Sequence, residues 1–153
     1  MTLKEKIESS LLAYLQPLAE SDQPLNSVPL LPGHTAGKRR LPCVIVYAER
    51  RSPNDVFPPG TGVYDVSVKV YVLTQADDED SAVQGARVQA TQDKLNDTDE
   101  LRAVLNAPAE NRPVADLHIY DFIENPDDEG RDERHFGEVL NYTAICQGVD
   151  GPS

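Results

Sequence analysis

The stretch V-Y-D-V-S-V-K-V-Y-V-L-T at residues 63–74 decides the fold, because it carries the clearest periodic pattern in the chain. Its apolar positions alternate with polar ones, and the two sets are Tyr64, Val66, Val68, Val70 and Val72 on one face and Asp65, Ser67 and Lys69 on the other. A period of two is typical of a β-strand with one buried face. The stretch therefore predicts a strand whose even-numbered side chains lie in the core.

Three further segments have the character of strands. Residues 43–49 are apolar on both faces, which predicts a central strand. Residues 117–123 form a third strand and residues 136–147 a fourth, whose buried face holds Phe136, Leu140, Tyr142, Ala144 and Cys146. The Pro/Gly-rich residues 50–62 and the polar residues 125–134 are turns. The four strands therefore make two hairpins.

Apolar residues at helical spacing predict a helix over residues 3–19, carried by Leu3, Ile7, Leu11, Leu15 and Leu18. Thr2 and Glu5 form a capping box in front of it. A second helix at 79–96 has small apolar side chains that allow close approach to a sheet. Asp97 and Glu100 cap a short third helix that holds Leu101, Val104 and Leu105.

The order of elements is α-β-β-α-(α)-β-β, which predicts an α+β fold: a single, mostly antiparallel sheet of about four strands with helices packed on one face. With 153 residues we expect one domain. It comprises the helix at 3–19, a Pro-rich extended arm at 20–42, the sheet and helices at 43–147, and a short tail at 148–153. A connection as long as the arm is uncommon in a compact domain, and its leucines and valines suit packing against another surface.

Composition excludes several classes of protein. There are 26 acidic and 14 basic residues, giving a net charge of −12, which argues against a general nucleic-acid binder. No apolar run is long enough to cross a membrane, and the N-terminus lacks the pattern of a secretory signal. Cys43 and Cys146 lie in apolar runs, so we expect reduced thiols in a cytosolic product.

No pattern of residues indicates catalysis. Isolated histidines, none within a nucleophile motif, occur at His34, His118 and His135. The turn that begins at Asn125 imitates a calcium loop, but its twelfth position is Phe136 instead of glutamate. We interpret Asp77–Asp80 as a helix start. Zinc spacing and phosphate-binding glycine loops are absent from the sequence. We therefore expect no catalytic residue, no cofactor and no metal.

Charge is distributed unevenly. Residues 38–51 hold five bases, Lys38, Arg39, Arg40, Arg50 and Arg51, but one acid, Glu49. Residues 121–135 hold seven acids and two bases, with Asp127, Asp128 and Glu129 at the centre. Each cluster alone is compatible with a solvated face. Together they suit head-to-tail association between copies, so Arg39, Arg40, Arg50, Arg51, Asp127, Asp128 and Glu129 are candidate assembly residues.

Four segments carry a family resemblance: P-C-V-I-V-Y-A-E at 42–49, G-V-Y-D-V-S-V-K-V-Y-V at 62–72, T-Q-A-D-D at 74–78, and N-Y-T-A-I-C at 141–146. With the N-terminal helix and the Ala-rich helix, their order resembles the tail-terminator, or tail-completion, proteins of long-tailed bacteriophages. The resemblance covers residues 40–147. It implies an α+β subunit that forms a homohexameric ring, catalyses no reaction and binds no membrane.

The same resemblance implies the partners. The ring caps the tail tube protein, docks to the head-completion or connector protein, and becomes part of the virion neck after assembly in the host cytoplasm. DNA passes through its channel without specific binding. Two alternatives stay open: another neck component, such as a head–tail adaptor or head-closure protein, and a small cytosolic α+β enzyme or ligand-binding domain. An enzyme should show a pocket with convergent polar groups, whereas an assembly protein should show a defined ring.

Overall fold

The computed structural model describes residues 2–33, 42–57, 60–74, 81–108, 110–125, 130–131 and 137–148. The elements follow the chain as helix α1 (Leu3–Leu15), the 3-10 helix η1 (Gln16–Ala19), strands β1 (Leu30–Pro32), β2 (Cys43–Pro53) and β3 (Val63–Leu73), helices α2 (Ser81–Asn96) and α3 (Thr98–Leu105), and strands β4 (His118–Glu124), β5 (Gly130–Arg131) and β6 (Gly137–Gln147). The predicted α+β class is confirmed.

The strands form one mixed sheet in the order β1-β2-β3-β6-β4, and β5 pairs with β6. β1 runs parallel to β2, while the other pairings are antiparallel. The two predicted hairpins exist as β2–β3 and β4–β6, and β3–β6 pairing joins them. The prediction of a mostly antiparallel sheet of about four strands is roughly compatible with this sheet, but the count and the order differ. β1 lies within the segment expected to be an extended arm, and β5 lies within the segment expected to be a turn.

β1 escaped detection because it is three residues long and contains a proline, so it shows no alternation. Its register pairs Leu30 with Val44 and Pro32 with Val46. Gly33 directly follows the strand, and its N–H donates to the Val46 carbonyl at 2.8 Å. A Cβ at Gly33 would lie 2.6 Å from the Cβ of Tyr47, so only glycine fits where β1 leaves the sheet.

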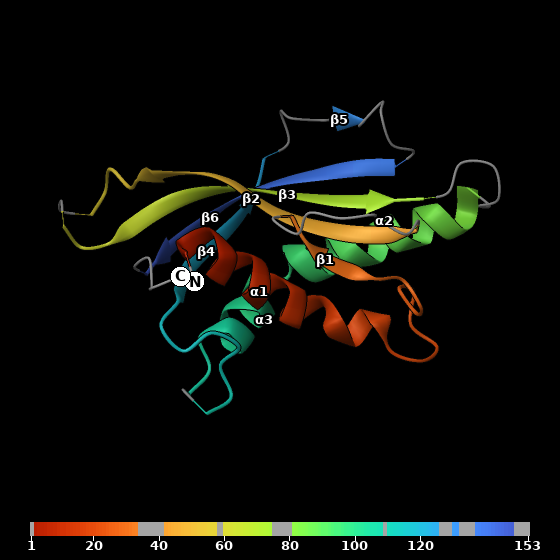
Figure 1. Ribbon diagram of the computed structural model, residues 1–153, viewed down its shortest axis with the longest axis horizontal. Helices are drawn as coiled ribbons and strands as arrows, with labels where there is room; N and C mark the ends of the chain where they lie inside the picture. Colours follow the sequence, from red (N-terminus) through yellow and green to blue (C-terminus); the bar gives the residue numbers. More distant parts are fainter. Residues whose placement is uncertain are drawn as a thin grey trace.

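The helices lie on one side of the sheet, as predicted (Figure 1). Between the two layers is a continuous core to which all three helices contribute: Leu3, Ile7, Leu11 and Leu15 from α1, Val88 and Leu95 from α2, and Leu101 and Leu105 from α3. The sheet supplies the facing side chains, among them Val44, Val46, Val66, Val68, Val70 and Val72. Two apolar layers with one shared interior are the usual solution for an α+β fold.

The predicted faces of β3 and β6 are confirmed for the described residues, and Phe136, which was predicted to lie on the buried face of β6, is outside them. Val66, Val68, Val70 and Val72 are at most 1% exposed. Val66 pairs with Ala144 and Val68 with Tyr142, so the buried face of β6 continues that of β3. The ring of Tyr142 stacks on Phe122 of β4 with centroids 4.6 Å apart, which extends the same face to the edge of the sheet.

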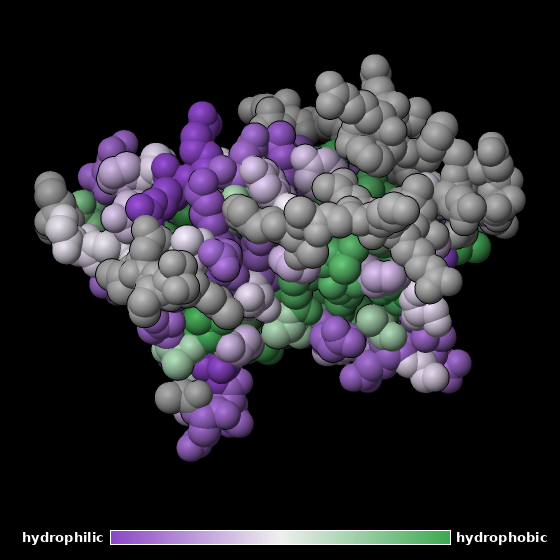
Figure 2. Space-filling model, in the orientation of Figure 1, coloured by the Kyte–Doolittle hydropathy of each residue, from purple (hydrophilic) through white to green (hydrophobic). Residues whose placement is uncertain are grey.

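β2 is buried on both faces near its start. Beside its contribution to the main core, Cys43 and Ile45 join Leu73 in a second cluster on the opposite face, against which Leu31 and Tyr71 pack. Figure 2, in the same orientation as Figure 1, shows hydrophobic residues near the middle of the molecule. Figure 1 places β1 in the same region. The prediction of a central strand is correct for this part of β2.

Two predicted boundaries are wrong. α1 ends at Leu15 instead of residue 19, because Pro17 lacks an N–H and the chain tightens into the 3-10 helix η1. β2 continues through Pro53, although residues 50–62 were expected to form a loop. A β-bulge between Ala48 and Arg50 breaks the alternation that a sequence pattern would follow.

The register of β3 predicts a sharp contrast between neighbouring positions. Val68→Asp buries an unpaired carboxylate and should lower the free energy of unfolding by about 3–5 kcal/mol. Lys69→Asp on the opposite face, where the side chain is 35% exposed, should cost about 1 kcal/mol or less. Urea unfolding of both variants measures the difference. Equal losses would contradict the register.

Both cysteines are free thiols with no exposed surface. Burial, with the nearby Asp65 carboxylate as a smaller contribution, raises the pKa of the Cys146 thiol to about 12. We therefore expect no reaction with a thiol reagent in the native protein at neutral pH. Two thiols per chain should react once the protein is denatured without reductant, and finding fewer would indicate a disulfide.

Candidate functional site

Two of the seven candidate assembly residues lie in the described part of the chain. Arg50 and Arg51 lie near the far end of β2, and their side chains are exposed. The hairpin of β2 and β3 extends past the helical layer at this end (Figure 1). The remaining candidates, Arg39, Arg40, Asp127, Asp128 and Glu129, lie outside the described residues. The structure therefore brings together one pair of the predicted set.

As neighbours in a strand, the two arginines lie on opposite faces of the hairpin, and the bulge before them decides which face each one takes. Arg50 pairs with Ser67, which belongs to the face away from the helices, and Arg51 pairs with the core residue Val66. The Arg51 guanidinium lies 5.0 Å from the centroid of the Tyr64 ring, a cation–π contact worth about 0.5–1 kcal/mol at an exposed site. Positive charge thus projects to both sides of the hairpin end.

A buried carboxylate holds the start of this bulge, and the sequence analysis did not find it. Glu8 of α1 is 1% exposed, and its Oε2 accepts the backbone N–H of Ala48 at 2.8 Å. Ala48 lies just beyond the part of β2 that β1 covers, so its outward N–H has no strand partner there. The available signal was the spacing: Glu8 precedes Leu11 and Leu15 by three and seven residues, which places it on the apolar stripe of the helix.

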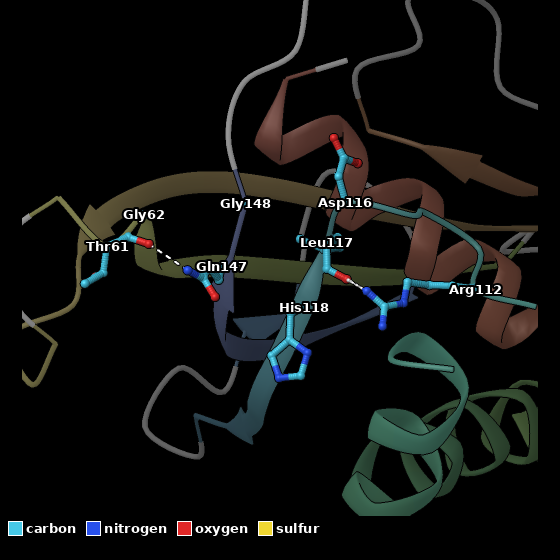
Figure 3. A pocket seen from close by; sticks show the side chains of 8 residues that line it. All are labelled: Thr61, Gly62, Arg112, Asp116, Leu117, His118, Gln147 and Gly148. Atoms are coloured by element: carbon cyan, nitrogen blue, oxygen red, sulfur yellow. Dashed lines mark hydrogen bonds between the residues drawn. The ribbon is translucent and has the colours of Figure 1, made fainter. Parts of the chain in front are cut away.

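A hollow of about 310 Å³ lies where the start of β3, the start of β4 and the end of β6 meet (Figure 3). It is lined by Thr61, Gly62, Arg112, Asp116, Leu117, His118, Gln147 and Gly148. Of the three histidines in the sequence, only His118 lies within the described residues. It is the first residue of β4 and lines this hollow. Its ring makes an edge contact with Tyr120 at a centroid distance of 4.6 Å.

The polar side chains of the hollow are largely engaged inside the chain. Arg112 donates to four backbone carbonyls of its own loop, those of Asn106, Ala107, Ala115 and Leu117, at 2.8–3.5 Å. Gln147 donates to the Thr61 carbonyl at 2.8 Å and accepts from Tyr120 at 2.9 Å. Lys6 of α1 donates to Asp116 at 2.7 Å. These groups stabilise the loop and do not converge on a common empty point, in contrast to an ordinary ligand pocket.

The other candidate ligands of the sequence analysis fall outside the described residues: His34, His135, the run Asp77–Asp80 and the turn position Phe136. Within the described ranges, no group of three or more His, Cys, Asp or Glu side chains is placed to hold a metal ion. The helices of the described chain include none with the length and apolar character that a bilayer crossing requires.

No family model matches this chain, and a search of curated proteins likewise found no match. The fold alone does not define a function, because α+β architectures serve many unrelated ones. The function is therefore argued from the placement of individual side chains.

The Lys6–Asp116 pair predicts a dependence of stability on pH. Lys6 is 3% exposed, and its hydrogen bond to Asp116 lowers the pKa of that carboxyl. A carboxyl with a lowered folded-state pKa stabilises the protein above its unfolded pKa of about 3.9, and this contribution is lost as the pH falls through the folded value. Asp116→Asn should therefore be less stable than the parent at pH 7.

The difference between Asp116→Asn and the parent should shrink as the pH falls below about 4, because the parent then loses the same carboxylate. Urea unfolding between pH 7 and pH 3 measures it. Glu110→Gln, on the exposed part of the same loop, is the matched control and should show no such convergence. A pH-independent difference between Asp116→Asn and the parent would mean that the ion pair adds nothing.

Proposed function

We propose that this chain is a structural virion-assembly protein, a tail terminator that forms a ring, caps the tail tube and joins it to the head–neck connector. The observation that carries the proposal is the exposed Arg50–Arg51 pair at the end of a hairpin that extends past the helical layer, in a chain of net charge −12. Two exposed arginines on an acidic protein favour contact with an acidic surface, which another copy of the same chain supplies.

Charge separation of this kind favours head-to-tail contacts. The helical side of the molecule carries exposed acids on and around α3, including Asp97, Asp99 and Glu100. Of these, Asp99 and Glu100 have cationic partners within the same region, Arg102 and Lys94. A contact between the basic hairpin end of one copy and an acidic face of the next is heterologous, and such contacts close into rings when the rotation permits. Asp127, Asp128 and Glu129 are the complement that the sequence suggests.

The partners follow from this assembly role. The tube protein and the head-completion protein would bind the two faces of the ring, and DNA would pass through its channel. Because each copy carries −12, an acidic channel wall would discourage DNA from adhering during passage. A ring whose channel is lined by the 38–51 bases would contradict that arrangement. The role requires no catalytic residue and no cofactor, and it would place the protein in the virion neck after assembly in the host cytoplasm.

A second candidate is another neck component, a head–tail adaptor or a head-closure protein. In that role the same charged hairpin would form contacts at a different level of the neck. Binding to purified tail tubes distinguishes the terminator from these. A ligand-binding domain is favoured by the hollow beside His118, but the internal bonds of Arg112 and Gln147 count against it.

The test is reversal of charge at the hairpin end. Arg50→Glu/Arg51→Glu should leave the circular dichroism spectrum native, because exposed charges contribute little to folding. Ring formation, measured as mass in solution, and joining of tails should both fall, and the difference from the parent should be largest at low salt, because salt screens the charge interactions of both proteins. Arg39→Glu/Arg40→Glu tests the other half of the basic segment.

Lys4→Glu is the control, because it reverses a charge on α1 at a helix start, where a negative side chain is well tolerated. It should assemble as the parent does. If both arginine double variants assemble and join tails like the parent at every salt concentration, the arginines serve solubility alone and the proposed contact is wrong. A parent protein that stays monomeric and does not bind tails would refute the terminator proposal itself.

A further inference from the structure

β4 is the edge strand of the sheet, and its outward backbone groups can be identified from the register. The N–H of Asn125 donates to the Asn141 carbonyl, so alternate residues of β4 counted back from Asn125 turn their backbone groups toward β6. The intervening residues, and Ile119 beyond the bulge, turn theirs away from the sheet. Such groups form a template on which another strand can pair.

Three polar side chains spaced four residues apart face these outward groups: Thr98 and Arg102 of α3, and Asn106, which caps the C-terminus of the helix. We call them the α3 stripe. Residues four apart lie above one another on a helix, so the stripe runs along the edge of β4. Apolar side chains of α3, Leu101 and Leu105, point into the core and fix the helix in this position.

The side chains of the α3 stripe form hydrogen bonds with individual backbone groups of β4. The amide of Asn106 pairs with both backbone groups of Ile119: its Nδ2 donates to the carbonyl at 2.7 Å, and its Oδ1 accepts the N–H at 2.8 Å. Arg102 donates to the Tyr120 carbonyl at 3.4 Å, and Thr98 donates to the Phe122 carbonyl at 3.4 Å. Asn106 thus makes the two bonds that a neighbouring strand would make.

The side chains of Asp121 and Arg112 bind further backbone groups along this edge of the sheet. The N–H of Phe122 donates to the Asp121 side chain at 2.9 Å, and Arg112 donates to the Leu117 carbonyl at 3.5 Å. The bulge between Ile119 and Asp121 adds a twist that disfavours a further strand. From Leu117 to Phe122, the outward backbone groups identified above therefore have side-chain partners.

We propose that the α3 stripe closes a latent interaction surface on β4, and that the partner it excludes is the same edge of a second copy of this chain. Antiparallel pairing of two identical edges is self-complementary, so one opened copy offers another the same row of donors and acceptors. Ile123, 44% exposed on the open face of the sheet at this edge, would add apolar contact to such a pair. The inference stands apart from the proposed assembly role.

The experiment removes, in the full chain, the hydrogen bonds that the Asn106 side chain makes to the backbone of β4. Asn106→Ala removes both bonds to Ile119, whereas Asn106→Asp keeps an acceptor for the N–H and loses the donor to the carbonyl. Hydrogen exchange of the Ile119 amide should rise by about tenfold in Asn106→Ala and by less in Asn106→Asp. Mass in solution, compared with the parent at equal concentration, should show added self-association in the same order. Val104→Ala, on an exposed position of α3, should change neither.

A second substitution identifies the surface that associates. Ile123→Lys in the Asn106→Ala background places a charge on the edge strand and should restore the mass of the parent, because charged edge residues oppose strand pairing. Association that Ile123→Lys does not reverse would overturn the proposal. So would faster exchange at Ile119 without any added association, or unchanged exchange. Where Asn106→Ala fails to fold, Asn106→Asp with and without Ile123→Lys gives the same decision.

Discussion

The pairing of β3 with both of its neighbours is the constraint on which the rest of the structure depends. All eleven residues of β3 pair with β6, and ten of them pair with β2. Since side chains alternate, a slip of one residue would turn Val66, Val68, Val70 and Val72 of β3 toward the open face. The register therefore decides at once where α1, α2 and α3 can bury their leucines. A single well-patterned strand thus determines where three helices can pack, including α2, whose apolar side chains are small.

Side chains of the helices also complete the hydrogen bonding of the sheet. Glu8 supplies an acceptor at one edge, beyond the end of β1, and Asn106 supplies a donor and an acceptor at the other. On the Glu8 side, β2 ends in Pro53, which has no N–H to offer. Buried backbone groups without partners cost free energy comparable to a lost hydrogen bond, so these contacts stabilise the fold as well as blunting its edges. The Arg112 guanidinium has the same role, because it donates hydrogen bonds to backbone carbonyls of a loop without regular secondary structure.

Local patterns predicted the local features correctly. The capping box of Thr2 and Glu5, the N-cap of Asp97 and the faces of β3 and β6 follow from residues close in sequence, and the structure confirms them. The features that escaped prediction depend on partners far away in sequence. Glu8 meets Ala48 across 40 residues and Lys6 meets Asp116 across 110, while β1 exists only because β2 is there to pair with. Of the candidate site, the sequence identified Arg50 and Arg51 as a charged pair, but the bulge that decides which face each of them takes has no sequence signature.

The closed edge at β4 limits how copies of this chain can meet. Where side chains occupy the outward backbone groups of an edge strand, as they do along β4, association by strand addition is disfavoured and contacts between folded copies depend on side chains. The exposed side chains of the described chain include charged ones such as Arg50, Arg51 and Asp97. Charged rims affect the orientation and speed of association more than its affinity. Contacts of this kind would be reversible and sensitive to salt until several of them act together, as in a closed ring. Such reversibility favours correct assembly, because a misplaced subunit held by few ion pairs dissociates before further subunits fix it in place.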